Sequence, residues 1–414
     1  MLSLSDVRGI ATTLATRAAS KLLAEAGDLV AATDSKRYHH NPYPLLERIR
    51  AKGPVYKGLS GLYALTSHTV CAQALKHPQM KVQPPPGKRD LFMTQTNALE
   101  GSFVLLDAPD HTRLRRVTAP AFRPKMMREL RGKIEATTHR LLDQLGTEFD
   151  LMTEFAGPLP ITVISDLLGI PDADTARFGR YGMVIAEALD GLSTPAKVRE
   201  YNAAYADIEQ LFTRLMAERR KDPGDDVISV LVTAEAEEKV TTDELMTTCM
   251  LLLLAGFETT VNMIGNATVL FSEHPDQWDL LKAQPDLAPS VVEEVLRYES
   301  PVPMLMRFAH ERVELDGGVL PAGAAVLLMV NAANRDPEIF PEPHRFDITR
   351  TRTVEHLAFG GGVHYCLGAP LSRLEGDIAF RAMAERFSTI KLTGEPERRF
   401  SNTIRGFSTI PVRV

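Results

Sequence analysis

One long apolar stretch constrains the fold more than any other feature of this chain. Residues 242–271 read as a single helix that is apolar on nearly every side, and they include the run from Met250 to Phe257. A helix without a polar face has to be buried, so we expect it to pass through the middle of a large core. The apolar run is shorter than the roughly 20 residues that cross a bilayer, and we therefore expect no membrane span.

The rest of the chain predicts more helices and a few short strands. Prolines 158, 160 and 171 and Gly191 should interrupt the helical region between 110 and 218. Ser60 and Gly61 separate two short β-type runs and predict a hairpin. The other expected elements are helices at 287–298 and 368–387, a strand at 326–330, further strands up to 414, and irregular segments at 83–87 and 335–350. We therefore predict a mainly α fold with small peripheral β-sheets.

Length and composition indicate one large globular domain. The 414 residues are 44% hydrophobic and contain neither a Ser/Gly-rich linker nor a repeat, so we assign residues 36–414 to a single domain. Residues 1–35 form an N-terminal extension of uncertain role, with an apolar helical face that either docks on the domain or rests on a membrane surface or another protein. The net charge of −6 argues against nucleic-acid binding, which needs a concentrated basic surface.

The chain has three cysteines, and only one of them stands in an unusual context. Three scattered cysteines cannot form a disulfide framework, so we expect a reducing, cytoplasmic location. Cys71 and Cys249 lie in apolar segments and read as small buried hydrophobic residues. Cys366 lies in a loop, residues 359–368, that has four glycines and precedes an apolar helix. The start of a helix favours a thiolate, and a thiolate is a metal ligand and a nucleophile.

Three readings of Cys366 compete before any family is considered. A structural zinc site would need four ligands, and no second Cys/His pair stands at a suitable spacing from His364 and Cys366. A nucleophilic cysteine would need a base and a third group that orients the base. The loop offers His364 as a base but no third group. A buried cysteine in a turn is the default for a lone residue, but the glycine pattern argues against it.

The long apolar helix carries a second unusual segment, from Ala255 to Thr260. Gly256 costs about 1 kcal/mol relative to alanine inside a helix, which indicates local loosening or the close approach of a flat ligand. Glu258 is an acid among apolar residues, and such a group is costly unless it is paired, hydrated or used. Taken alone, Glu258 would lie at a solvated edge and Thr259 would pack against another helix.

The loop around Cys366 resembles the heme-binding loop of the cytochrome P450 family, in particular its soluble bacterial members. The signature positions that match are Phe359, Gly362, His364, Cys366 and Gly368. The resemblance runs from about residue 40 to the end of the chain. It implies a heme b cofactor whose iron is bound by Cys366, and a contact between His364 and a heme propionate. Thiolate ligation is the property that separates such enzymes from globins.

The resemblance also implies roles for residues outside the loop. Thr259 and Glu258 match the oxygen-activation motif and would assist proton delivery, and Ala255 would lie against the heme. His111, Arg115 and Arg307 match groups that hold the heme propionates. Glu294 and Arg297 match a buried ion pair that stabilises the fold, with Arg345 as its third member.

The implied reaction is a monooxygenation of a small lipophilic substrate by O2, namely hydroxylation or epoxidation. Electrons would come from NAD(P)H through a separate ferredoxin and its reductase, because the chain has too few cysteines for an iron–sulfur cluster. Arg113, Arg116 and Arg373 are the candidate docking residues, and we expect a monomer. The substrate pocket should include the loop after Pro86 and residues Leu251, Ala255, Met304, Met306 and Ile404.

Two other functions fit the same loop. A peroxide-driven heme-thiolate enzyme is disfavoured by Glu258 and Thr259, which suit proton delivery after reduction of dioxygen. A heme-thiolate sensor without catalytic activity would not need those two residues at all.

Overall fold

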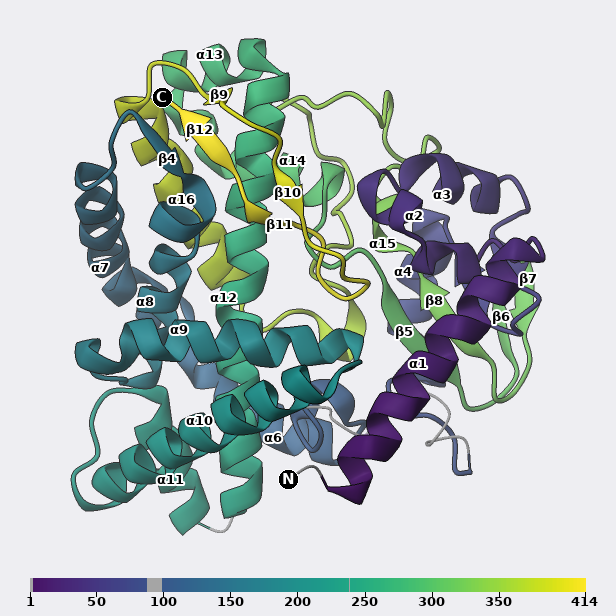
Figure 1. Cartoon of the computed structure of the whole chain (residues 1–414), viewed down its shortest axis with the longest axis horizontal. Helices are drawn as coiled ribbons and strands as arrows, with labels where there is room; N and C mark the ends of the chain where they lie inside the picture. Colours follow the sequence, from purple (N-terminus) through teal and green to yellow (C-terminus); the bar gives the residue numbers. More distant parts are fainter. Residues whose placement is uncertain (1–2, 88–98, 238) are drawn as a thin grey trace. The chain divides into compact units, whose positions relative to one another are not determined.

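The structure is a computed structural model that describes residues 3–87, 99–237 and 239–414, and most of these residues are helical (Figure 1). The α-helices are α1 (Leu4–Glu25), α2 (Lys36–His40), α3 (Tyr43–Arg50), α4 (His68–Lys76), α6 (Asp110–Thr118), α7 (Pro124–Asp143), α8 (Pro158–Leu168), α9 (Asp172–Glu187), α10 (Pro195–Lys221), α11 (Val227–Ala236), α12 (Thr242–Glu273), α13 (Pro275–Ala283), α14 (Ala288–Tyr298), α15 (Val330–Ala333) and α16 (Ala369–Arg386).

The strands are short. They are β1 (Val55–Lys57), β2 (Tyr63–Leu65), β3 (Met80–Lys81), β4 (Glu148–Asp150), β5 (Leu305–Ala309), β6 (Val313–Leu315), β7 (Gly318–Leu320), β8 (Ala325–Leu328), β9 (Lys391–Leu392), β10 (Glu397–Arg398), β11 (Phe407–Thr409) and β12 (Pro411–Arg413). Short helical turns are η1 (Ala31–Asp34), η2 (Phe103–Leu105), η3 (Ala119–Phe122), the π-helical η4 (Met152–Ala156), η5 (Ala188–Asp190), η6 (Pro285–Leu287) and η7 (Gly362–His364). The prediction of a mainly α fold with small sheets is confirmed.

The predicted elements agree closely with the observed ones. The hairpin around Ser60 and Gly61 is present, because β1 and β2 pair antiparallel with Val55 opposite Leu65. The long apolar helix is α12, which ends at Glu273, just before Pro275 begins α13. The predicted break at Pro158 is present, because the π-helical η4 ends at Ala156 and α8 begins at Pro158. Pro160 lies in the first turn of α8, where the missing N–H costs nothing.

Helix α12 is apolar because it is buried. Among the described residues, α12 is the helix that is long and apolar enough to cross a membrane by length and composition. From the sequence we expected no helix of this kind. However, 83% of its most apolar window is buried inside the protein. The apolar composition is therefore explained by packing in a core.

The chain divides into two compact units. The first unit contains Met1–Ala15, Asp90–Thr137 and Gly157–Glu258, and the second contains Thr16–Arg89, Thr138–Ala156 and Thr259–Val414. The first unit is helical, with α10 packed on both α9 and α11, and α8 packed on α9. The chain passes from the first unit to the second within α12, between Glu258 and Thr259.

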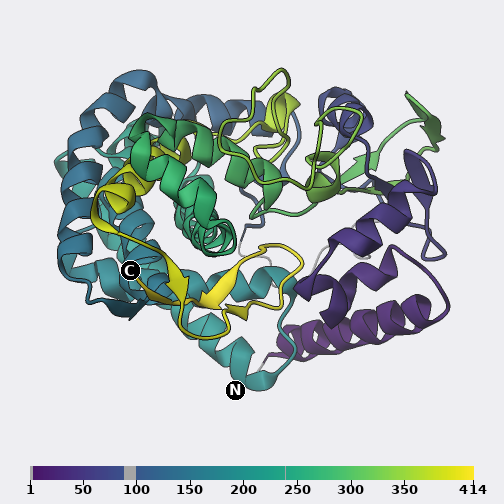
Figure 2. The same cartoon turned by 90° about the horizontal axis from the view of Figure 1, so that it is seen from above.

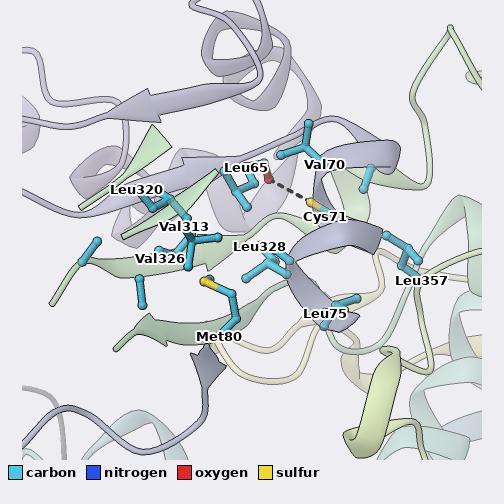
Figure 3. Close-up of a cluster of buried hydrophobic side chains, with 14 of the residues drawn as sticks. Leu65, Val70, Cys71, Leu75, Met80, Val313, Leu320, Val326, Leu328 and Leu357 are labelled. Carbon is cyan, nitrogen blue, oxygen red and sulfur yellow. Dashed lines mark hydrogen bonds between the residues drawn. The ribbon is translucent and has the colours of Figure 1, made fainter. Parts of the chain in front are cut away.

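The second unit contains the strands. One five-stranded sheet has the order β1-β2-β8-β5-β3, in which β2 and β8 are the parallel pair. Its buried core joins the sheet to α4 through side chains such as Leu65, Val70, Met80 and Leu328, and the Cys71 thiol donates a hydrogen bond to the Leu65 carbonyl at 3.4 Å (Figure 3). The last residues of the chain, yellow in Figure 2, form the two-stranded sheet β10-β11 and the strands β9 and β12. In the other small sheet β12 lies between β9 and β4, and β4 comes from the middle of the chain.

A buried ion pair links α14 to the irregular segment that follows α15. Glu294 accepts two hydrogen bonds from Arg297, from Nε and Nη2, each at 2.8 Å, and both side chains are buried. The prediction of a buried Glu–Arg pair is confirmed, but the prediction for Arg345 is wrong. The Arg345 side chain is exposed and faces Glu342 and Asp347, and only its backbone carbonyl accepts from Arg297. Arg350 takes the third place, with Nε 3.3 Å from Glu294 Oε1.

Candidate functional site

The loop before Cys366 has a backbone shape that requires glycine. Gly360 and Gly362 have φ angles of 70° and 64°, in the left-handed region that other residues avoid. A Cβ atom on Gly362 would lie 2.2 Å from the Leu75 carbonyl oxygen of α4. The loop closes on itself where the Cys366 N–H donates to the Phe359 carbonyl at 2.9 Å. These contacts fix the position of the cysteine within its own loop.

Cys366 differs from the other two cysteines in its exposure. Cys71 and Cys249 are buried, and burial raises the pKa of each thiol. Cys366 is exposed and lies just before α16, which begins at Ala369. The N-terminal end of a helix stabilises a nearby negative charge, so Cys366 is the cysteine placed to act as a thiolate ligand.

Arg373 on α16 braces the cysteine loop. Its Nε donates to Glu293 Oε1 at 2.6 Å, and its Nη1 donates to the Tyr365 hydroxyl at 3.1 Å. Its guanidinium also lies over the Phe359 ring, 4.6 Å from the centroid. This explains Arg373 as a positioning residue within the second unit, whereas the sequence had suggested it for partner docking. Glu293 was missed, although it stands beside the Glu294 that was singled out.

Helix α12 is accessible at one place in its middle. Ala255 is exposed and Thr259 is half-buried, whereas their neighbours Leu254 and Glu258 are buried. The helix is regular through this segment, so the predicted loosening at Gly256 is absent. The glycine is needed for another reason: a Cβ atom there would lie 2.7 Å from the Ile164 side chain of α8. Close packing of α8 on α12 therefore gives a reason for glycine at this position, and the approach of a flat ligand stays a prediction.

The sequence also missed a buried carboxyl group on α16. Burial raises the pKa of Glu375 to about 8, an effect that the Thr260 hydroxyl partly offsets. Thr260 also donates to the Ser372 hydroxyl at 3.3 Å, so polar groups from α12 and α16 meet here. Within the described residues, neither carboxyl oxygen of Glu375 has a partner with hydrogen-bond geometry. The signal that could have marked this site is the helical spacing of Glu375 with the apolar residues Leu371, Ile378 and Ala379, which puts the acid on the buried face of α16.

The pKa of Glu375 predicts a pH-dependent stability. The native state holds this proton more tightly than the unfolded chain, so stability is lost as pH rises from about 4.5 towards 8. Glu375→Gln should remove that loss. Between pH 4 and pH 7 the free energy of unfolding of wild type should therefore fall by about 3 kcal/mol relative to that of the variant. Urea unfolding of both proteins at several pH values measures this. Equal slopes with pH would contradict the prediction, and Glu395→Gln, at an exposed position, is the control.

The residues predicted to hold heme propionates belong to both units. His111 and Arg115 lie on α6 in the first unit, where burial, and then Arg115, lower the pKa of His111. Arg307 is buried on β5 in the second unit, and its Nη1 donates to the Met306 carbonyl at 2.7 Å. His364 lies in η7, within the cysteine loop. A role for these four in binding propionates stays a prediction.

The predicted pocket residues are also divided. Leu251 and Ala255 belong to the first unit, and Met304, Met306 and Ile404 to the second. Met304 and Met306 are half-buried and pack on a hydrophobic cluster that includes Leu327 and Met329. Ile404 is buried. The loop after Pro86 continues into residues 88–98, which lie outside the described residues.

The residues present fit a heme better than a zinc ion. Over the described ranges no group of three or more His, Cys, Asp or Glu side chains is placed to hold a metal, so a zinc site is unsupported. A heme needs one protein ligand to its iron, and the exposed thiol of Cys366 in its glycine-rich loop is such a ligand.

Comparison with known proteins decides the family. The family model described as Cytochrome P450 matches residues 183–414. A cytochrome P450 of Priestia megaterium, CYP107DY1, is 38% identical over 375 residues, which cover 86% of this chain and 90% of that protein. The chain belongs to the cytochrome P450 family. The 6-deoxyerythronolide B hydroxylase of Saccharopolyspora erythraea is 39% identical over 74% of this chain and 76% of its own length. The crystal structure of ligand-free CYP164A2 of Mycobacterium smegmatis superposes with a TM-score of 0.84 at 38% identity, covering 93% of this chain and 99% of that one.

As a cytochrome P450, the protein is a heme-thiolate monooxygenase with heme b, and it receives electrons from NAD(P)H through redox partners. Bound heme supplies the chemistry that activates O2 and transfers one oxygen atom to a substrate. Cys366 stays the predicted ligand of the heme iron, and Thr259 and Glu258 of α12 stay predicted to assist the reaction.

Proposed function

We propose that this cytochrome P450 hydroxylates or epoxidises a small lipophilic substrate, and that its electrons come from a ferredoxin. The observation that carries the proposal is the exposed thiol of Cys366, held in a glycine-dependent loop at the start of α16. The accessible patch at Ala255 and Thr259 on an otherwise buried helix supports it. We also propose that the protein is a cytoplasmic monomer and that residues 36–414 act as one catalytic domain.

The proposed substrate class rests on the chemistry of the predicted pocket residues. Leu251, Ala255, Met304, Met306 and Ile404 are all apolar, and methionine side chains adapt to irregular shapes. A pocket built from them would favour an apolar ligand, with few polar groups to fix its orientation. A relative at 39% identity is by its name a hydroxylase, which supports hydroxylation as the reaction.

Proton delivery is proposed for Thr259 and Glu258. They are consecutive residues of α12, and Thr259 is half-buried next to the exposed Ala255 patch, whereas Glu258 is 3% exposed. The hydroxyl of Thr259 would orient the last water or proton donor, and Glu258 would exchange protons with solvent through water. This division of labour suits reduced dioxygen, which needs protons, more than added peroxide.

One assay tests the proposal directly. The purified holoenzyme is incubated with a panel of lipophilic ligands, and those that shift the heme spin state are taken as substrates. Turnover is then measured with ferredoxin, ferredoxin reductase and NAD(P)H, and separately with hydrogen peroxide. Product formation that requires ferredoxin and O2 supports the proposal. Two results contradict it: product formation with hydrogen peroxide but not with ferredoxin and NAD(P)H, or no turnover of any ligand that binds.

Thr259→Ala should uncouple the reaction. Without the hydroxyl, the last proton donor is not oriented. We therefore expect the rate of NAD(P)H oxidation to stay within about threefold of wild type. The yield of product for each NAD(P)H consumed should fall about tenfold, and hydrogen peroxide should be released instead. Product, peroxide and NAD(P)H are measured together. Thr268→Ala is the matched control, because Thr268 is buried on the same helix and its hydroxyl is bonded to the Ile264 carbonyl. Unchanged coupling in Thr259→Ala would remove Thr259 from this role.

Arg116 is the best-placed docking residue of the three that the sequence suggested. Arg113 is already engaged, because Glu244 and Asp110 form ion pairs with it and raise its pKa. Arg116 is exposed on the same helix, α6. A surface cation contributes to the encounter with an acidic partner mainly through the association rate.

Arg116→Glu should therefore slow reduction by ferredoxin about tenfold at low salt, with a smaller effect at high salt. Stopped-flow reduction of the holoenzyme measures the rate. The exposed Arg312→Glu variant controls for the change in net charge. If the two variants are slowed equally, docking at Arg116 is wrong.

A further inference from the structure

A large polar cavity in the second unit has no part in the chemistry described so far. Its volume is about 1200 Å³, and residues of α3, α12, α14 and the β9–β11 region line it. Arg335, from the segment that follows α15, lines this cavity. Arg398 and Arg405 line it as well, together with Glu299.

Two of the three arginines are fully engaged by the protein. Arg405 donates from Nε to Glu299 and from Nη1 to the His39 carbonyl at 2.5 Å. Arg335 donates twice to the Tyr298 carbonyl, at 2.9 and 2.7 Å, and lies between two aromatic rings, those of Tyr43 and Tyr298. Both side chains are therefore held in place by structural contacts.

Glu299 cannot neutralise the third arginine. One carboxyl oxygen of Glu299 accepts from Arg405, and the other accepts from the Tyr43 hydroxyl at 2.6 Å. Burial opposes its ionisation, but Arg405, Arg398 and Arg335 outweigh that effect and lower the pKa of Glu299 to about 2. One buried carboxylate thus faces three guanidinium groups, which leaves an excess of positive charge.

Arg398 carries this excess. Its guanidinium lies over the Phe407 ring at 4.3 Å, and its Nη1 is 3.8 Å from Glu299 Oε1, too far for a hydrogen bond. Within the described residues Nη1 has no hydrogen-bond partner. The other acids that line the cavity, Glu47, Glu273 and Glu395, are at exposed or half-buried positions where solvent screens them.

A second polar atom in the same cavity lacks a partner. Asn266 is 1% exposed, and its Nδ2 donates to the carbonyls of Glu299 and Arg405 at 3.1 and 3.5 Å. These two acceptors fix the amide orientation, and over the described ranges its Oδ1 has no partner. A buried acceptor of this kind is costly unless a bound molecule supplies a donor.

We propose that this cavity binds an oxyanion, a phosphate or carboxylate group, through the guanidinium of Arg398. An arginine held flat on an aromatic ring presents its N–H groups in a fixed fork that suits such an anion. The buried side chains of Val269, Leu270 and Phe407 also line the cavity, so an anion with an apolar body can be accommodated beside the guanidinium. This ligand site is independent of the oxygenation reaction.

Isothermal titration calorimetry of the holoenzyme tests the site, with sodium phosphate and sodium decanoate as probes at ionic strength held constant with sodium chloride. We expect saturable binding of at least one probe to wild type. The variant Arg398→Gln should weaken it about tenfold or more, and Arg398→Lys about threefold or more, because a charge remains but the planar fork is lost. Arg312→Gln, which removes an exposed arginine of β5–β6, should bind as wild type does.

The two probes distinguish the source of the anion. Binding of phosphate alone assigns the site to a phosphate group, binding of decanoate alone assigns it to an amphipathic carboxylate, and binding of both assigns it to oxyanions in general. Circular dichroism shows whether each variant is folded. If Arg398→Gln does not fold, a folded Arg398→Lys that binds both probes as well as wild type overturns the proposal instead. The proposal is overturned if wild type binds neither probe, or if a folded Arg398→Gln binds as well as wild type. Decanoate that shifts the heme spectrum equally in wild type and Arg398→Gln has bound elsewhere and counts against a carboxylate site.

Discussion

Cys366→Ser abolishes monooxygenase activity, with product formation expected to fall at least about a thousandfold. Serine has nearly the same size, so the loop held by the Cys366 N–H and the Phe359 carbonyl should keep its shape. The oxygen of serine is a far weaker ligand for heme iron than a thiolate, and the electron donation that favours O–O cleavage is lost. The measurement is product formation with ferredoxin and NAD(P)H, together with the absorption spectrum of the reduced carbon-monoxide complex.

The other cysteines provide matched controls for this experiment. Cys71 and Cys249 are buried, and burial raises the pKa of each, so neither is placed to be a thiolate. Cys249→Ala should keep both the thiolate-type spectrum and the activity. A Cys366→Ser protein that binds heme and retains the thiolate-type spectrum would overturn the assignment of the ligand.

Glu294→Gln should produce the largest loss of stability. Glu294 and Arg297 are buried, and two hydrogen bonds of 2.8 Å join them, with Arg350 and the Asp347 N–H also bonded to Glu294. Removing the carboxylate leaves the guanidinium of Arg297 buried without a countercharge, at a cost of about 3–5 kcal/mol. Urea unfolding of the holoenzyme, or the melting temperature where unfolding is irreversible, measures the loss.

The exposed residues Glu342 and Arg345 provide control variants for this experiment. Glu342→Gln removes an exposed partner of Arg345 and should cost less than about 1 kcal/mol. Arg350→Gln should destabilise the protein more than Arg345→Gln does, because only the Arg350 side chain reaches Glu294. Equal effects of Arg345→Gln and Arg350→Gln would show that the ion-pair network described here is wrong.

Motifs within one segment could be predicted well from the sequence. Residues 359–368 combine a required glycine shape, a cysteine and a following helix, and all of these depend on neighbours in the chain. The bounds of α12 and α14 were also predicted to within two residues. Local backbone chemistry determines such features, so they can be read before the fold is known.

Pairings between distant segments could not be predicted in the same way. Arg345 and Arg350 both stand in one irregular stretch, and nothing in their spacing says which side chain turns inward to Glu294. Nothing in the sequence indicated that Gly256 makes room for Ile164 of α8, 92 positions earlier in the chain. The role of Arg373 as a brace likewise depends on Glu293, 80 positions earlier in the chain.

The sequence by itself determined the family and the mainly helical fold and predicted Cys366 as the thiolate ligand, because periodicity, glycine conformations and a contiguous motif are local properties of a chain. Only the tertiary structure decided which charges are compensated. It showed Arg113 and Arg373 paired, Glu375 buried with a raised pKa, and Arg398 left with an unused N–H beside Glu299. The physical reason is that the energy of a charge depends on burial and on neighbours brought from far along the chain, and both arise only when the chain is folded.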